Sequence, residues 1–206
     1  MNKNRLEALS DGIFSIVMTL LVIEIVVPEL HSANDRDLFM ALSHLGPLFV
    51  GYFVSFAVLA MFWIAHNFFY GAFTKNVNRV LVLLNILYLS FVALIPFSAH
   101  LLGEYPALRL AIFLYGLNVF IIGILAWIIL RYALNSKEID TDHLSRRLLV
   151  QAQIRSALTP ICTILGMLAV WVSIPLALFL YTFPIAFNII PGLLDRLERL
   201  LKLNFD

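Results

Sequence analysis

The sequence predicts an all-α integral membrane protein with six transmembrane helices, and composition is the first reason. Of 206 residues, 62% are hydrophobic and only 13% are charged, whereas a soluble domain carries roughly a quarter charged residues. A soluble fold of this size cannot hide so much apolar surface, because a large share of its residues must face water. The length and spacing of the apolar runs and the distribution of basic residues are the other two reasons.

Six apolar runs approach or exceed the length of a membrane span, which needs about 20 mainly apolar residues. They are residues 8–28, 44–73, 79–102, 107–134, 156–173 and 175–194. The second and fourth are long, so they are expected to tilt or to extend beyond the bilayer. The last two meet at Val172-Ser-Ile-Pro175, where a tight hairpin is favoured because residues 160–195 are too long for one crossing. Residues 1–206 are therefore interpreted as one six-helix transmembrane domain.

The lysines and arginines are concentrated on one side of this six-span arrangement. Only Arg36 and Arg109 fall on the opposite side, among several acidic residues. The cytoplasmic side of a membrane protein is the one enriched in basic loop residues, so both termini are predicted to be cytoplasmic. The basic residues on that side are Lys3, Arg5, Lys75, Arg79, Arg131, Lys137, Arg146, Arg147, Arg155, Arg196, Arg199 and Lys202.

Several classes of function are disfavoured by what the chain contains. Fourteen basic and thirteen acidic residues give no basic surface for a nucleic acid. The single cysteine, Cys162, cannot form an intrachain disulfide and is interpreted as a small core residue. The histidines lack metal-ligand spacing, so neither a cofactor nor an enzymatic activity is expected. The connector at about residues 135–153 is interpreted as solvated.

Polar residues at membrane depth are the most informative ones, because a charge at the centre of a span costs about 2.5–3.5 kcal/mol. Given the six-span topology, Asp11, His66 and Asn85 lie at a similar depth near the cytoplasmic side. His66 and Asn85 are therefore the expected donors to a buried Asp11. The residues alone leave two interpretations open, a hydrogen-bond cluster that joins three helices and a proton or cation site. The first helix carries Arg5, Glu7, Ser10, Asp11, Ser15, Thr19 and Glu24.

Ile16, Leu20 and Ile23 fall within about 60° of one another on the first helix, at 100° per residue. Asp11 points about 140° away from Ile16 by the same rule. Periodicity alone favours a lipid-facing or core role for this aliphatic stripe.

Three segments resemble the endolysosomal potassium-channel family, transmembrane protein 175 and its bacterial relatives. The first is Arg5-Leu-Glu-Ala-Leu-Ser10-Asp11 with the helix that follows, where the family has Arg-x-x-x-Phe-Ser-Asp and this chain has Leu9 at the phenylalanine position. The others are Phe62-Trp-Ile-Ala-His-Asn-Phe-Phe69 and the segment 85–98. The matches lie in the first half of the chain, and the six-span layout continues the resemblance.

The resemblance implies a bacterial homotetramer in the cell membrane, with a central pore lined by the first helix of each copy. Potassium and other monovalent cations would pass Ile16, the main constriction, with Thr19, Leu20 and Ile23 also lining the path. It further implies hydrogen bonds within each subunit among the signature positions, which are Arg5, Ser10, Asp11, Trp63, His66 and Asn85.

The expected function is a potassium-permeable channel with a hydrophobic constriction and modest selectivity over sodium. A ring of aliphatic side chains dewets when narrow and conducts when it widens, and the chain has no Thr-Val-Gly-Tyr-Gly filter. The alternative is a proton-coupled transporter or a proton leak pathway.

Overall fold

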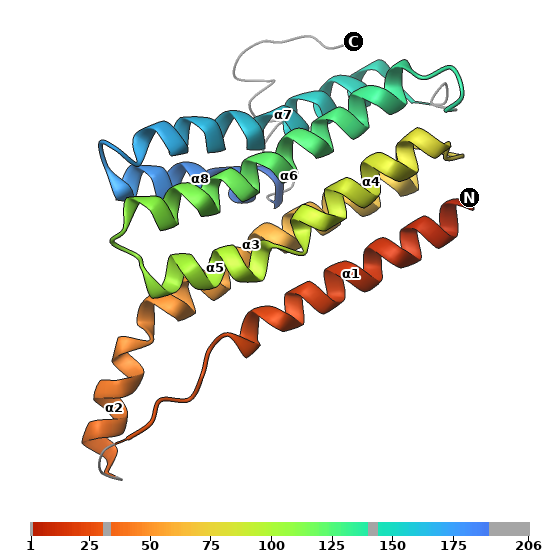
Figure 1. Cartoon of the computed structure of the whole chain (residues 1–206). Helices are drawn as coiled ribbons and strands as arrows, with labels where there is room; N and C mark the ends of the chain where they lie inside the picture. The colour runs from red at the N-terminus through yellow and green to blue at the C-terminus, as the bar shows by residue number, and fades with distance from the viewer. Residues whose placement is uncertain (1, 31–33, 140–143, 190–206) are drawn as a thin grey trace.

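The computed structural model describes residues 2–30, 34–139 and 144–189, which form a bundle of helices (Figure 1). α1 lies along one edge of the bundle, α7 and α8 lie along the opposite edge, and the other long helices lie between them (Figure 1). In chain order the elements are α1 (Lys3–Ile23), α2 (Asp35–His44), α3 (Gly46–Phe68), the π-helical turn η1 (Phe69–Phe73), α4 (Arg79–Val92), α5 (Ile95–Glu104), α6 (Arg109–Asn135), α7 (Arg146–Ala169) and α8 (Ile174–Ile189).

Five helical segments of the described chain are long and apolar enough to cross a membrane, so the chain is a multi-pass membrane protein. They are Lys3–Ile23, Gly46–Phe73, Arg79–Glu104, Arg109–Asn135 and Arg146–Ala169. They correspond to the first five predicted spans. α8 is apolar but has 16 described residues, about 24 Å of helix at 1.5 Å per residue. Residues 190–194 of the predicted sixth span lie outside the described residues, so the count of six stays a prediction.

Two of the predicted spans differ from the helices in their boundaries. The first helix covers 3–23 rather than 8–28. It begins at the N-cap Asn2, whose side chain accepts from the Asn4 N–H at 3.1 Å, and Pro28 disfavours helical geometry in the residue before it. The fifth helix begins at Arg146 rather than 156, where the Ser145 hydroxyl accepts a hydrogen bond from the Leu148 N–H at 3.3 Å. The connector predicted at 135–153 is correspondingly shorter.

Two features of the helices have no counterpart in the predicted spans. α2 lies between the first two spans and begins at the N-cap Asn34, whose side chain accepts from the Asp37 N–H at 2.8 Å. The predicted span 79–102 consists of two helices, α4 and α5, with a break at residues 93–94. Pro96 lies in the first turn of α5, where its missing N–H is tolerated.

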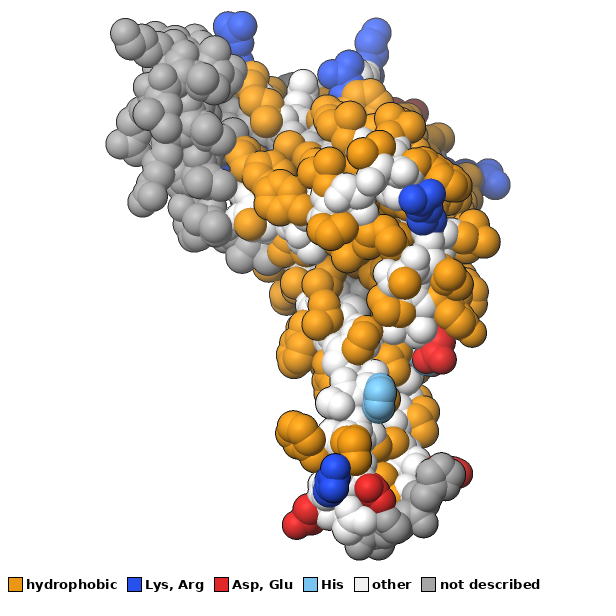
Figure 2. All heavy atoms as spheres, turned by 90° about the vertical axis from the view of Figure 1, so that its left-hand side faces the viewer, with side chains coloured by type: hydrophobic (Ala, Val, Ile, Leu, Met, Phe, Trp, Pro, Cys, Tyr) orange, Lys and Arg blue, Asp and Glu red, His pale blue; other side chains and the backbone are white. Residues whose placement is uncertain are grey.

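Different parts of the chain lie at the two ends of the bundle. The start of α1, the start of α4, the end of α6 and the start of α7 lie toward one end (right in Figure 1). α2 and the turns α5–α6 and α7–α8 lie toward the other. Figure 2 looks onto that second side, where hydrophobic side chains cover much of the visible face and charges of both signs gather at the tip formed by α2. The charges of this second end are therefore concentrated on α2.

α7 and α8 form the hairpin that the sequence favoured, joined by a turn in which the Ser173 N–H donates to the Ala169 carbonyl at 2.8 Å. The ring of Tyr181 on α8 is 2% exposed and lies against Gly116 of α6 and Gly166 of α7. A Cβ atom at either glycine would overlap the tyrosine ring. The two glycines therefore allow three helices to approach one aromatic side chain.

Gly116→Ala is expected to destabilise the bundle by about 1–3 kcal/mol, because overpacking a filled core forces its neighbours to move. In an open helix interior the same change stabilises by about 1 kcal/mol, so the sign of the effect reports the contact with Tyr181. Thermal unfolding in detergent measures it, with Gly46→Ala as the control because no atom lies within 4 Å of a Cβ there. Equal midpoints for the two variants would contradict the contact.

Candidate functional site

The first helix presents two faces of different character. One packs against α3, α4 and α5; its buried residues are Leu6, Ser10, Phe14, Val17 and Leu21. The aliphatic stripe lies on the other face, where Ile16 is 59% exposed, Leu20 is 40% exposed and Ile23 is 66% exposed. At 100° per residue the two faces are about 120° apart. In a single chain the stripe is thus uncovered, and in a membrane it must meet lipid or another protein surface.

Thr19 flanks this stripe and is exposed. Its hydroxyl donates to the Ile16 carbonyl at 2.7 Å, one turn back along the helix. That bond uses the only proton of the hydroxyl, so the oxygen keeps lone pairs that can face outward. The side chain can therefore act as an acceptor toward a cation or water beside the stripe.

On the packed face, a buried chain of hydrogen bonds joins three helices. The Asn85 side chain of α4 donates through Nδ2 to the Ser10 hydroxyl of α1 at 3.1 Å. Its Oδ1 lies 2.8 Å from His66 Nε2 of α3, and the Ser10 hydroxyl itself donates to the Leu6 carbonyl at 2.9 Å. Asn85 is fully buried and His66 is 7% exposed. Asn85 acts as the central member of the chain, because its two ends bind two different helices.

Aromatic rings enclose the histidine of this chain. The His66 ring lies 4.6 Å from the ring of Tyr70 and 5.8 Å from that of Tyr88, measured between centroids. The second pair is stacked, with an angle of 16° between the planes, and Phe14 of α1 lies 5.9 Å away. The packing holds the His66 ring in one orientation, so its bond to Asn85 is fixed by both polar and apolar contacts.

Asp11 belongs to a second, separate contact, which corrects the expectation that His66 and Asn85 are its donors. Its carboxylate accepts from the Trp63 indole N–H at 2.9 Å. The Asn67 amide lies beside both groups and, with its nitrogen turned toward Asp11, donates to the carboxylate at 3.3 Å while accepting from Trp63 at 2.8 Å. Depth alone matched Asp11 to His66, but Asp11 points to a different side of α1 from Ser10.

The two basic residues at the start of α1, Lys3 and Arg5, differ in the contacts that they make. Arg5 is exposed, and within the described residues it has no hydrogen bond or ion pair to the other signature positions. Lys3 donates to the Thr74 carbonyl at 2.8 Å and lies 3.8 Å from a Glu7 oxygen. The contact between Lys3 and Glu7 was not predicted, although their i,i+4 spacing is a recognisable signal for it.

At the far end of α1, the Glu24 carboxylate lies 3.6 Å from His100 Nδ1 of α5. Both side chains are partly exposed. Within residues 2–30, 34–139 and 144–189, no group of three or more His, Cys, Asp or Glu side chains is arranged to hold a metal ion. The contacts that α1 makes through Ser10, Asp11 and Glu24 hold this helix against α3, α4 and α5.

Comparison with known proteins gives sequence matches to the first half of the chain, which contains α1, α3 and α4. The sequence model of the family described as endosomal/lysosomal potassium channel TMEM175 matches residues 5–96. A potassium channel of Streptomyces collinus is 38% identical over 49% of this chain and 48% of its own length. The human endosomal/lysosomal proton channel TMEM175 is 38% identical over 48% of this chain and 20% of its own length. The chain therefore spans about half the length of the bacterial relative and less of the human one.

The fold extends the likeness through most of the chain. The crystal structure of a lysosomal potassium-selective channel TMEM175 homolog from Chamaesiphon minutus superposes with a TM-score of 0.79 and 25% sequence identity. That match covers 90% of this chain and 95% of the other. A potassium channel of Chamaesiphon minutus is also 34% identical over 54% of this chain and 56% of its own length.

Proposed function

Because this chain is a member of the endosomal/lysosomal potassium channel TMEM175 family, we propose that it forms a potassium-permeable cation channel. The proposed assembly is a homotetramer with a central pore lined by α1 of each copy. The observation that carries the proposal is the uncovered aliphatic stripe of α1, about 120° around the helix from the face that packs on α3, α4 and α5. The family and the matching structure are described as channels, so transport rather than catalysis is the activity.

In this assembly Ile16 forms the main constriction, and Leu20 and Ile23 form wider rings one and two turns outward. A narrow ring of aliphatic side chains excludes water and blocks ions, and a small widening admits both. Potassium passes Ile16, Thr19 and Leu20 without a fixed binding site. Since no ring of backbone carbonyls replaces the hydration shell, the preference for potassium over sodium is modest.

The polar contacts of α1 serve to hold this constriction in place. The chain from Ser10 through Asn85 to His66 fixes one side of the helix to α3 and α4. The bond from Trp63 to Asp11 fixes a second side, near the same depth. A helix held at two points around its circumference cannot rotate freely, so the stripe keeps facing one direction.

The chain is proposed to lie in the cell membrane of a bacterium, with both termini in the cytoplasm. The start of α1, the end of α6 and the start of α7 lie toward one end of the bundle (Figure 1). Basic residues concentrate in these segments and in 190–206, and the cytoplasmic side is the basic one.

A second candidate function is proton conduction, because the vertebrate relatives are described as proton channels. His66 is the titratable group of the described chain that lies deepest in the polar contacts of α1. A proton path would need a continuous series of such groups, and the stripe of α1 offers none.

Purified protein in liposomes tests the proposal. Potassium efflux is expected to exceed sodium efflux by a few-fold, with caesium measured alongside and no saturation at high concentration. A pH-sensitive dye inside the same vesicles follows protons. Flux that saturates and depends strictly on a proton gradient would favour the transporter, and vesicles silent to every ion would reject the channel.

A further inference from the structure

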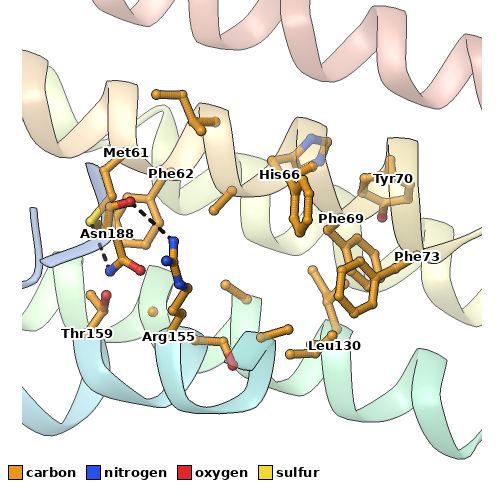
Figure 3. Close-up of a pocket in the computed structure, with 18 of the residues that line it drawn as sticks. Met61, Phe62, His66, Phe69, Tyr70, Phe73, Leu130, Arg155, Thr159 and Asn188 are labelled. Atoms are coloured by element: carbon orange, nitrogen blue, oxygen red, sulfur yellow. Dashed lines mark hydrogen bonds between the residues drawn. The ribbon is translucent and has the colours of Figure 1, made fainter. Parts of the chain in front are cut away.

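A cavity of about 390 Å³ lies between α3 with η1, α6, α7 and the end of α8 (Figure 3). It is partly open to the outside and its walls are mainly apolar, with Phe62, Phe69 and Leu130 among them. Its volume falls in the range of about 300–1,000 Å³ that is typical of ligand pockets. Most of its walls belong to segments that are long and apolar enough to span a membrane, so lipid lies next to them.

The guanidinium of Arg155 projects from α7 into this cavity (Figure 3). Its one hydrogen bond within the described chain runs to the Asn188 carbonyl at 3.5 Å, the outer limit for such a bond. No aspartate or glutamate of the described residues lines the cavity. Charged side chains in membrane-spanning segments are normally paired, and the described residues that line the cavity supply no anion for Arg155.

Two more polar atoms of the cavity wall have no partner in the described chain. They are Nδ1 of His66 and the hydroxyl of Tyr70, both buried. Buried polar side-chain atoms in proteins are generally hydrogen-bonded. Both residues stand on the α3 side of the cavity, across from Arg155 (Figure 3). The space between these groups therefore offers a cation and a hydroxyl donor beside apolar walls.

We propose that this cavity binds an anionic phospholipid of the surrounding leaflet. The phosphate pairs with the Arg155 guanidinium, and one acyl chain lies against Phe62, Phe69 and Leu130. Basic pockets between transmembrane helices recognise anionic lipid headgroups in this way. A soluble anion would satisfy the charge but leave the apolar walls without a partner, whereas an amphiphile satisfies both. The lipid would also contact His66, whose other nitrogen bonds Asn85 and, through it, α1.

Thermal unfolding of the purified full chain in detergent, with added lipid, tests this binding. Phosphatidylglycerol is expected to raise the unfolding midpoint by several degrees, whereas phosphatidylcholine with the same acyl chains and inorganic phosphate leave it nearly unchanged. Arg155→Gln is expected to weaken phosphatidylglycerol binding at least tenfold, and Arg155→Lys much less. Ala152→Phe fills the cavity while keeping the arginine, and is expected to remove the effect as well.

The matched control is Arg131→Gln, which removes an arginine near the end of α6 that stacks on Trp127 outside the cavity. This variant should keep the full response to phosphatidylglycerol. If Arg155→Gln does not fold, native mass spectrometry of lipid adducts on Ala152→Phe and wild type decides the matter. Equal shifts from both lipids, a shift from inorganic phosphate alone, or a retained response in Ala152→Phe would each overturn the proposal. Binding is measured without ion flux, so the outcome does not depend on the channel proposal.

Discussion

Ile16→Asn is expected to give a larger and less selective cation current than the wild-type chain. Ile16 is 59% exposed on the stripe of α1, and in the proposed tetramer its side chains form the narrowest ring. An amide in place of the aliphatic group keeps the ring hydrated, so the dewetting barrier falls. Each 1.4 kcal/mol removed from that barrier raises the flux about tenfold. Recording of reconstituted channels measures both the current and the potassium-to-sodium ratio.

Ile161→Asn is the matched control for this prediction. Ile161 is 54% exposed and lies on α7, at the edge of the bundle opposite α1 (Figure 1). The same substitution there should leave current and selectivity at the wild-type level. A response of equal size in both variants, or an unchanged current in Ile16→Asn, would argue against a constriction at Ile16.

Asn85→Leu is expected to lower the free energy of unfolding more than any other substitution considered for this chain. The change removes both side-chain hydrogen bonds of a fully buried residue and leaves His66 Nε2 without its partner. Helix–helix hydrogen bonds in bilayers average about 0.6 kcal/mol, and an unpaired buried group costs about 1–3 kcal/mol. The expected loss is therefore about 2–4 kcal/mol. Chemical unfolding in mixed micelles measures it.

Asn118→Leu separates a general effect of losing a buried asparagine from the role of Asn85. Asn118 on α6 donates to the Ser98 hydroxyl at 3.1 Å, and its Oδ1 has no partner in the described chain. Its replacement removes one bond and one unpaired acceptor, so its cost should be clearly smaller. Equal losses in the two variants would contradict the central position of Asn85.

The apolar runs of the sequence predicted where the five described spans lie, but they did not predict where the helices end or break. Apolar length marks where lipid surrounds a helix, so the five spans present in the described chain agree with the predicted runs. Helix ends depend on caps and prolines rather than on hydropathy. Ser145 starts α7 well before the apolar run, and Pro96 lies just after the break in the predicted third span. α2 was not predicted because its amphipathic sequence is too short and too polar to span a membrane.

For the polar contacts, topology gave the depth of each residue but not its direction around the helix. Asp11, His66 and Asn85 do lie near one depth, yet Asp11 bonds Trp63 while Ser10, one residue earlier, bonds Asn85. A step of one residue turns a helical side chain by 100°, so adjacent polar residues meet different neighbours. The sequence did not indicate that Arg155 lines a cavity, because segments from distant parts of the chain form the walls around it.

Oxidative cross-linking of single cysteines tests most directly whether copies of α1 meet at a shared axis. Cys162, the one native cysteine, is first replaced by serine, and Ile16→Cys, Ile23→Cys or Ile161→Cys is then introduced. A disulfide needs Cα atoms about 4.4–6.8 Å apart, a separation that neighbouring copies of Ile16 around a narrow pore would provide. Covalent dimers of Ile16→Cys, with none from Ile161→Cys, are the predicted result. Ile16→Cys that stays monomeric under oxidation while a lipid-soluble thiol reagent labels it would contradict the pore.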